Sequence, residues 1–199
     1  FWRMDGEGDL RLVPANDAIS GQMSTFGDNK NVEAPWADCA ENVRTFAVAD
    51  DAEGNRKYVN MEAGAYISNM FKDCTNLTQV DFSNFDTSLV VNMTGMFKNC
   101  QSLTSLNIRN LSTIEVTDME SMFEDCTAIT SIDLQSFNAL RVENMKYMFK
   151  GCKVLANVSF PPGFSPASVR YMNEMFANCT TLQTLNLSAF TAFNVIEMT

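Results

Sequence analysis

Histidine is absent from this chain of 199 residues. Its absence removes the commonest general base, the commonest metal ligand and every Ser-His or Cys-His nucleophile. The sequence also has no Cys-x-x-Cys pair and no glycine-rich phosphate-binding loop. We therefore expect a protein that is not an enzyme and that holds no cofactor and no metal.

Positive charge is scarce, and long apolar runs are missing. The chain has 14 Lys and Arg against 24 Asp and Glu, which gives a formal net charge of −10. This balance argues against a nucleic-acid partner, because phosphates are bound by clustered Lys and Arg. No apolar run approaches the roughly 18–20 residues of a membrane span, so we expect no membrane insertion by this segment. Since it begins at Phe1 without a signal peptide, we expect a mature or excised segment of a longer protein.

The chain repeats itself every 26 residues. The first clear copy reads MFKDCTNLTQVDFSNFDTSLVVNMTG from Met70, and further copies begin at Met96, Met122, Met148 and Met175, with spacings of 26, 26, 26 and 27. A period of this size is typical of solenoids, in which each turn buries its apolar face only against its neighbours. We therefore predict an α/β solenoid of five 26-residue repeats over residues 66–199.

Each copy contains an apolar alternation with the pattern L-x-x-L-x-L, which in the first copy is formed by Leu77, Val80 and Phe82. A period of two predicts a short strand with one buried face.

A second pattern places Met and Phe at positions i, i+3 and i+4, as in Met119, Met122 and Phe123. This spacing predicts one face of a short helix. Each turn is thus expected to contain a strand, a loop and a short helix.

Five cysteines form another column, with one member per copy. They are Cys74, Cys100, Cys126, Cys152 and Cys179. Adjacent rungs of a parallel stack are close enough for disulfides, but stacked inward side chains point the same way and five members do not pair evenly. Buried free thiols are the favoured interpretation, and disulfides between neighbouring turns are the alternative.

Residues 1–65 do not follow the period, and we expect a β-rich N-terminal cap with a degenerate repeat there. Residues 1–14 predict two short strands around a Gly-containing turn, and residues 15–31 predict a loop. Trp2 and Trp36 are expected in the core of the cap. The acidic loop at 50–55 could supply calcium ligands, but it lacks the alternation of an EF-hand loop.

The repeat unit M-F-x-x-C-x-x-L-x-x-L-x-L-S-x-F-x-T-x-x-V-x-x-M resembles the BspA-like leucine-rich repeat family of mostly bacterial cell-surface proteins. The copy at 70–93 is the most similar, and Ala34-Pro35-Trp36 is similar to the lead-in of such arrays. The resemblance covers roughly residues 34–199. It implies a right-handed leucine-rich-repeat array in a secreted or surface-attached protein, and some members are adhesins that bind host matrix proteins.

Outward-pointing strand residues form the surface that a partner would meet, and we predict a binding strip there. Its members are Gln79, Asp81, Ser83, Ser105, Asn107, Arg109, Ser131, Asp133, Gln135, Asn157 and Asn186. One column, formed by Asp81, Asn107, Asp133, Ser159 and Asn186, is open to two interpretations. These side chains either hydrogen-bond along the sheet or contact a ligand.

Taken together, these features predict a non-catalytic extracellular or cell-surface module for recognition and adhesion. Its partner would be a protein, such as a host extracellular-matrix or surface protein. A structural stalk that displays another domain is the alternative. Met198 occupies the helix-face Met column, so the array is expected to be truncated at its C-terminus. Its last strand would then be an unpaired edge that permits self-association.

Overall fold

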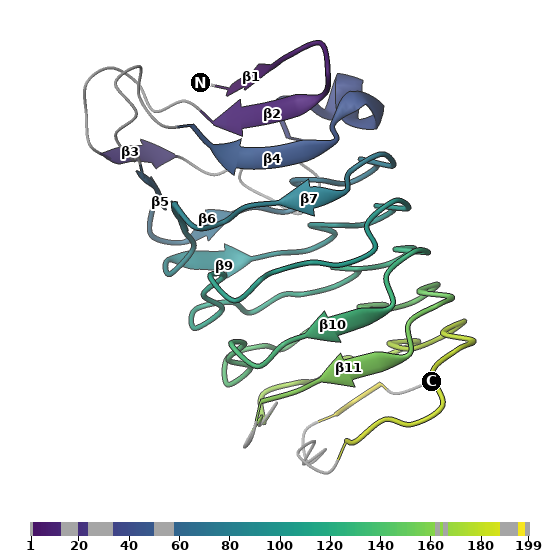
Figure 1. The fold of residues 1–199 in the computed structure, drawn as a ribbon. Helices are drawn as coiled ribbons and strands as arrows, with labels where there is room; N and C mark the ends of the chain where they lie inside the picture. Colours follow the sequence, from purple (N-terminus) through teal and green to yellow (C-terminus); the bar gives the residue numbers. More distant parts are fainter. Residues whose placement is uncertain are drawn as a thin grey trace.

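The computed structural model describes residues 2–12, 20–23, 34–49, 58–161, 164, 167–187 and 195–197. They form a stack of coils that runs from the N-terminal strands at one end to the C-terminal coil at the other (Figure 1). From Met70 on, each coil corresponds to one copy of the sequence repeat, and neighbouring coils are joined by parallel strand pairs or single bridges. The predicted repeat fold is therefore confirmed.

Secondary structure in the described residues is mostly short strand, with one 3-10 helix and no α-helix. The elements are β1 Trp2–Met4, β2 Asp9–Leu12, β3 Ser20–Met23, η1 Ala37–Asn42, β4 Thr45–Val48, β5 Tyr58–Met61, β6 Ala65–Tyr66, β7 Gln79–Val80, β8 Phe85–Asp86, β9 Val90–Asn92, β10 Ser131–Asp133 and β11 Asn157–Ser159.

The N-terminal strands belong to the same stack as the repeats. β1 and β2 pair antiparallel, which confirms the two strands predicted within residues 1–14. β2 then pairs in parallel with β4, and β4 with β7, so one sheet continues from the N-terminal segment into the first repeat. β3 lies within the segment predicted as a loop and pairs in parallel with β5. That part of the loop prediction was wrong, because period-two patterning is too weak to mark a four-residue strand.

Trp36 anchors the first coil. Its side chain is 1% exposed and its Nε1–H donates to the carbonyl of Met70 at 2.8 Å. Its ring also contacts Phe46 and Phe71. Trp2 packs edge-on against it at 6.1 Å but stays 37% exposed. The core position predicted for Trp36 is confirmed, whereas Trp2 is only partly covered.

The sheet containing β2, β4 and β7 is the first zone of strand pairing, and two further zones lie around each coil. In the second zone β5 pairs with β8, and in the third zone β6 pairs with β9. Beyond β9 the third zone continues as single parallel bridges, one per coil, and these link Asn92, Asp118, Asn144, Tyr171 and Glu197 in that order.

The Met and Phe segments are successive turns, and the short helices predicted for them are not present in the described residues. Phe97 N–H donates to Met122 O at 2.9 Å in the next coil, and Gly95 and Asn99 make the same kind of bond. The amides between them bond three residues back within their own coil. Three of these five N–H groups therefore join neighbouring coils and are not available for a helix.

Backbone conformation explains why a helix cannot form there. Each coil has two residues in the left-handed region, four residues apart. In the coil containing Met122 these are Ser121 with φ 57° and Asp125 with φ 58°. A right-handed helix is interrupted at both. The i, i+3, i+4 spacing of the apolar residues is met equally well by tight turns.

The core is continuous through the stack. Phe71, Phe97, Phe123, Phe149 and Phe176 stack face to face between consecutive coils, with ring centroids 5.2–5.6 Å apart. The first four of these rings are fully buried. The Leu column predicted to face inward is also fully buried at Leu77, Leu103, Ile129 and Leu155.

The cysteine thiols are free, as the favoured interpretation predicted. In four coils each thiol donates to the carbonyl of a Phe in the preceding coil, as Cys126 does to Phe97 at 3.1 Å. Burial raises the pKa of Cys126 to about 12 and that of Cys74 to about 12. These two side chains therefore act as small core residues, and their thiols stay protonated at neutral pH.

A buried polar ladder accompanies the bridges of the third zone, and the sequence analysis did not identify it. Asn92, Asp118 and Asn144 are each less than a tenth exposed. Each side-chain Oδ1 accepts the backbone N–H two residues later, at 2.9–3.0 Å. Asp118 also accepts from the Thr94 hydroxyl in the preceding coil at 3.0 Å. The polar atoms of this ladder are thus bonded both within and between coils.

Two expectations fall outside the described residues: the acidic loop at 50–55 and the C-terminal Met198. Among the described helices, none has the length and apolar character that a bilayer crossing requires.

Candidate functional site

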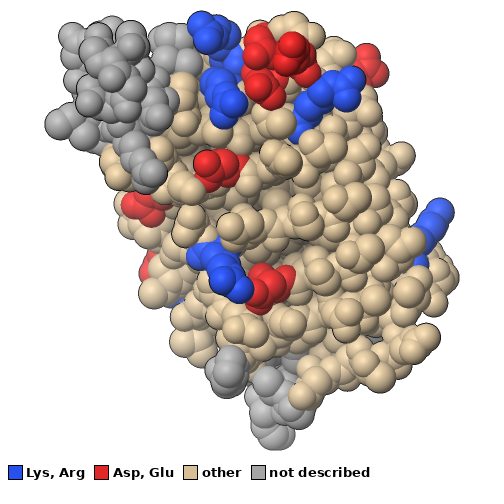
Figure 2. Space-filling view, viewed as in Figure 1, with Lys and Arg blue, Asp and Glu red and all other residues tan. Residues whose placement is uncertain are grey.

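The predicted binding strip lies on one face of the stack. All eleven of its side chains are exposed except that of Asp133, which is partly exposed. Figure 2 shows that charged side chains are sparse on this face. They gather over the N-terminal strands, and one facing pair of opposite charge lies further along. The outward orientation inferred from the period-two pattern is confirmed, and ligand binding there stays a prediction.

Local hydrogen bonds fix the polar column of this face. Asp81 Oδ1 accepts the N–H of Ser83 at 2.8 Å, and Asp133 Oδ1 accepts the N–H of Gln135 at 3.0 Å. Asn107 makes the corresponding bond at 3.3 Å. Asx turns of this kind hold the chain where it leaves the strand. One contribution of the column is therefore to set the turn within each coil.

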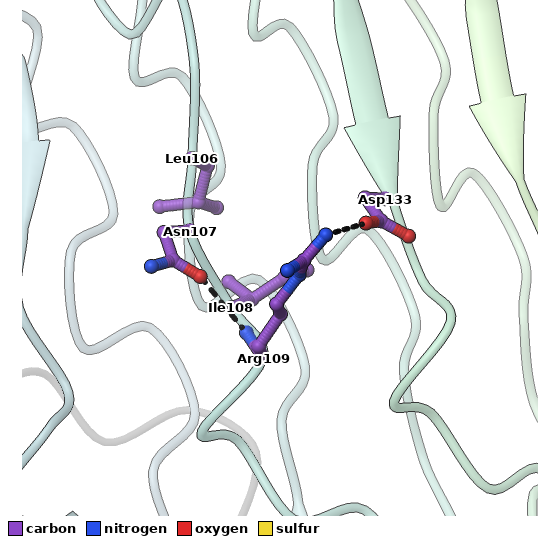
Figure 3. A pocket seen from close by; sticks show the side chains of 5 residues that line it. All are labelled: Leu106, Asn107, Ile108, Arg109 and Asp133. Carbon is purple, nitrogen blue, oxygen red and sulfur yellow. Dashed lines mark hydrogen bonds and ion pairs between the residues drawn. The ribbon is translucent and has the colours of Figure 1, made fainter.

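A hollow of about 260 Å³ opens on the face around Arg109. It is lined by Leu106, Asn107, Ile108, Arg109 and Asp133. The Arg109 side chain reaches across to the neighbouring coil, where Nη2 lies 3.1 Å from Asp133 Oδ2 (Figure 3). Ile108 is buried and Leu106 half-buried, so the hollow combines an apolar wall with a guanidinium, a carboxylate and an amide.

The hollow is lined by one positive and one negative side chain, Arg109 and Asp133. The backbone N–H of Gln135 and the Arg109 guanidinium together hold the pKa of Asp133 below its ordinary value. Arg109 and Asp133 therefore form a charged pair at neutral pH. The Arg109 side chain is 74% exposed and makes one contact with its carboxylate. Most of its five N–H donors remain accessible to a partner.

The strand pairing is open beside this hollow. No backbone hydrogen bond within the described residues joins residues 105–108 to a neighbouring coil. The equivalent residues further along do pair, as β10 with β11. Backbone N–H and C=O groups require a partner, whether protein or water. The Ile108 carbonyl accepts the hydroxyl of Ser136 from the next coil at 3.4 Å. Residues 105–107 therefore present hydrogen-bonding groups next to Arg109.

A second hollow, of about 380 Å³, lies over β2, β4 and β7 on the same sheet. It is lined by Asp9, Arg11, Thr45, Phe46, Ala47, Gln79, Val80 and Asp81. Arg11 and Asp9 form an exposed ion pair at 3.6 Å. Asp9, Arg11 and Thr45 were missed because residues 1–65 were treated as a separate cap. The apolar residues Leu10 and Leu12 alternate with Arg11, which is the period-two strand pattern of the repeats, and this signal could have identified the strand.

Across the described part of the chain, no three Cys, Asp or Glu side chains come together as a metal site.

Comparison with known proteins assigns the family. The family described as "Mycoplasma protein of unknown function, DUF285" matches residues 65–190 and 162–199, which is more than half of the chain. The chain belongs to the DUF285 family. The comparison with curated proteins found no match for this DUF285 chain.

One solved structure is similar, the crystal structure of the T. pallidum leucine-rich repeat protein TpLRR. It is 12% identical, with a TM-score of 0.38, over 92% of this chain and 87% of that one. A TM-score this low does not establish a shared fold, so the repeat architecture rests on the strand pairing described above.

Proposed function

We propose that this DUF285 chain is a non-catalytic recognition and adhesion module of a microbial cell-surface protein. Its partner would be a protein on a host or neighbouring cell, bound on the strand face. The coils would form a right-handed leucine-rich-repeat solenoid of the BspA-like type. The repeated sequence of this chain and its stack of coils are compatible with a protein-interaction module.

The observation that carries this proposal is the hollow at Arg109. It combines an exposed guanidinium, backbone groups of 105–107 that are not paired to a neighbouring coil, and an apolar wall. Arg is one of the residues enriched at the energetic centres of protein interfaces. Away from the charges over the N-terminal strands, the rest of the face is polar with few charges, as expected for the rim around such a centre.

The size of the face limits its affinity. Seven coils spaced by about 4.8 Å, each exposing about 15 Å of strand, give a surface of about 500 Å². A standard interface covers about 800 Å² on each partner. We therefore propose that one copy binds weakly, and that stable attachment requires several copies on one surface.

The experiment is a binding screen of immobilised chain against host extracellular-matrix proteins by biolayer interferometry. Saturable binding that falls about tenfold or more in Arg109→Ala supports the proposal. Lys98→Ala is the matched control, because Lys98 also forms an ion pair with the next coil, to Glu124 at 2.7 Å, but away from the strand face. Binding that is equally reduced by both substitutions would contradict it.

A structural stalk is the second candidate, and coil-to-coil bonding favours it. The turns containing Phe71, Phe97, Phe123 and Phe149 are all joined to the next coil by backbone hydrogen bonds. Such an array would resist extension along its axis. The stalk predicts no saturable binding by this segment to any protein of the screen, whereas another domain of the full-length protein would bind.

A further inference from the structure

Two hollows lie end to end along the strand face. The larger one is lined by residues in and beside β2, β4 and β7, and the smaller one by the next coil and by Asp133 of β10. In Figure 1 these strands follow one another down one side of the stack. Asp81 and Asn107 occupy the same position in consecutive repeats, and each lines one hollow. The two hollows therefore adjoin along the stack axis, where one partner segment can contact both.

The larger hollow has a small residue at its centre. By continuation of the strand register, Ala47 lies between Arg11 of the preceding coil and Asp81 of the following coil. Its methyl group leaves open the space that a longer side chain would fill, and Phe46 and Val80 also line the hollow. The hollow of about 380 Å³ thus offers an apolar floor between a guanidinium and a carboxylate.

Each hollow also contains an arginine with unused donors. The Arg11 side chain is 40% exposed and pairs with Asp9 at 3.6 Å, a distance too long for a hydrogen bond. The Arg109 side chain is 74% exposed and contacts Asp133 through one nitrogen. A guanidinium has five N–H donors, so most donors of both arginines are accessible to a partner.

The carboxylates that line the hollows accept hydrogen bonds from the chain itself. Asp9 accepts the Thr45 hydroxyl. Asp81 and Asp133 each accept, through Oδ1, the backbone N–H of the residue two positions later. Each carboxylate thus has a donor, whereas the Arg11 guanidinium has no hydrogen bond to a carboxylate of the described residues. This asymmetry favours a partner that supplies acceptors, and carboxylates fit a guanidinium best because they bind it through two parallel hydrogen bonds.

The separation of the two arginines sets the spacing required on the partner. Arg11 and Arg109 are three coils apart, and coils spaced by about 4.8 Å place them about 14 Å apart along the stack. An extended peptide rises about 3.3 Å per residue, and residues i, i+2 and i+4 lie on one side of it. Residues i and i+4 are thus about 13 Å apart. When residue i is placed at Arg11, residue i+2 lies over Ala47.

We infer that the two hollows together bind an extended segment of the partner protein, with carboxylates at positions i and i+4 and an apolar side chain at i+2. The segment lies along the stack axis, with one carboxylate at each arginine and the apolar side chain over Ala47. Arg109 lies two residues further along its strand than the column of Arg11, and the two long side chains cover this offset of about 7 Å. The inference rests on the proposed function, because it names the chemistry of the partner bound on the strand face.

The contact is short-range and weak. The chain has a net charge of −10, so no long-range attraction steers an acidic segment to the face. Exposed ion pairs contribute little singly, so two of them and one apolar contact give an isolated peptide a dissociation constant of about 0.1–1 mM. Several copies on one surface would bind more tightly.

The test is an NMR titration of the whole chain with capped peptides. The peptide Glu-Ser-Leu-Ser-Glu should shift the amide resonances of Arg11, Ala47 and Arg109 in a saturable way. The peptide Glu-Ser-Leu-Glu-Ser should bind at least about fivefold more weakly, because its second carboxylate points away from the face. Arg11→Gln and Arg109→Gln should each weaken binding about fivefold. Arg44→Gln is the matched control, because Arg44 is exposed but lines neither hollow, and it should leave binding unchanged.

A second variant tests the apolar floor separately from the charges. Ala47→Leu fills the larger hollow, so it should remove the advantage of Glu-Ser-Leu-Ser-Glu over Glu-Ser-Gly-Ser-Glu, which has no side chain to place there. Circular dichroism of each variant checks that the fold is retained.

Three results would overturn the inference: no saturable shift up to about 10 mM peptide, equal binding of Glu-Ser-Leu-Glu-Ser, or equal binding of Lys-Ser-Leu-Ser-Lys. Failure of the proposed function is seen separately. If matrix proteins bind through Arg109 but no peptide binds, the proposed function stands and this inference falls. If no protein of the screen binds, the proposed function falls, and the titration still decides whether the two hollows bind such a segment.

Discussion

Replacing Phe123 by alanine should destabilise the stack strongly. Phe123 is fully buried and stacks between two rings, with centroids 5.6 Å from both Phe97 and Phe149. Truncation removes a buried ring and leaves a cavity that the stacked rings on both sides cannot fill. Buried Phe-to-Ala changes cost about 3–5 kcal/mol, and the upper half of this range is expected here because the neighbouring coils are bonded in place.

Phe176→Ala is the matched comparison. Phe176 occupies the same column, but it is half-buried and has one described stacking neighbour, Phe149 at 5.2 Å. We expect a loss below about 2 kcal/mol for this variant. Asp133→Ala, on the open strand face, should cost less than about 1 kcal/mol.

Chemical denaturation followed by circular dichroism measures these losses, with hydrogen exchange as a second readout because repeat arrays can unfold in parts. The reasoning is refuted if Phe123→Ala and Asp133→Ala destabilise the chain equally. A loss at Phe176 that matches the loss at Phe123 would show that Phe176 is as fully covered as Phe123, and would contradict its half-buried position.

Three further predictions follow from individual residues. Cys126 should react with a bulky thiol reagent far more slowly in native than in denatured protein, because burial raises its pKa to about 12; equal rates would contradict this. Asn178, with φ 62°, should tolerate Gly but lose about 1–2 kcal/mol on change to Val, as thermal unfolding can show. An NMR titration should place the Asp133 pKa below its ordinary value, so its contribution to stability is present at neutral pH and is lost as pH falls through that value. Arg109→Ala should raise this pKa only in part, because the bond from Gln135 N–H is the larger cause.

The period and the inward columns could be predicted from sequence because stacking imposes the same environment on every copy. Leu77 and Leu103 face the core for this reason, and so does Ile129. Local turn geometry was harder to predict. A helical spacing is satisfied by Met119, Met122 and Phe123 although no helix forms there. The left-handed backbone region is occupied by Tyr147 and Glu174, whereas sequence rules assign such positions to Gly or Asn.

One available signal was overlooked in the turns. The second left-handed column contains only Asp, Asn and Gly: Asp73, Asn99, Asp125, Gly151 and Asn178. These are the residue types that tolerate such backbone angles, and their recurrence in every copy argues against a helix.

The candidate site was predictable only in outline. Alternation shows that Asn107 and Arg109 point outward, but the hollow depends on the missing strand pairing at 105–108. Pairing between neighbouring coils is a tertiary property, and the sequence of residues 105–108 does not differ in pattern from its paired counterpart at 131–134. The buried carboxylate of Asp118 was likewise not predictable, because two of its partners, Thr94 and Asn144, come from neighbouring coils.

Hydrogen exchange at single-residue resolution tests the central claim most directly, namely that an open segment of the strand face offers backbone groups beside Arg109. The amides of Phe97 and Phe123, which donate to the next coil at 2.9 Å, should exchange slowly. The amides of Ser105 and Asn107 should exchange orders of magnitude faster, near the rate of an exposed loop. Equal protection of the two groups would show a closed, continuous sheet at this position and would contradict the account.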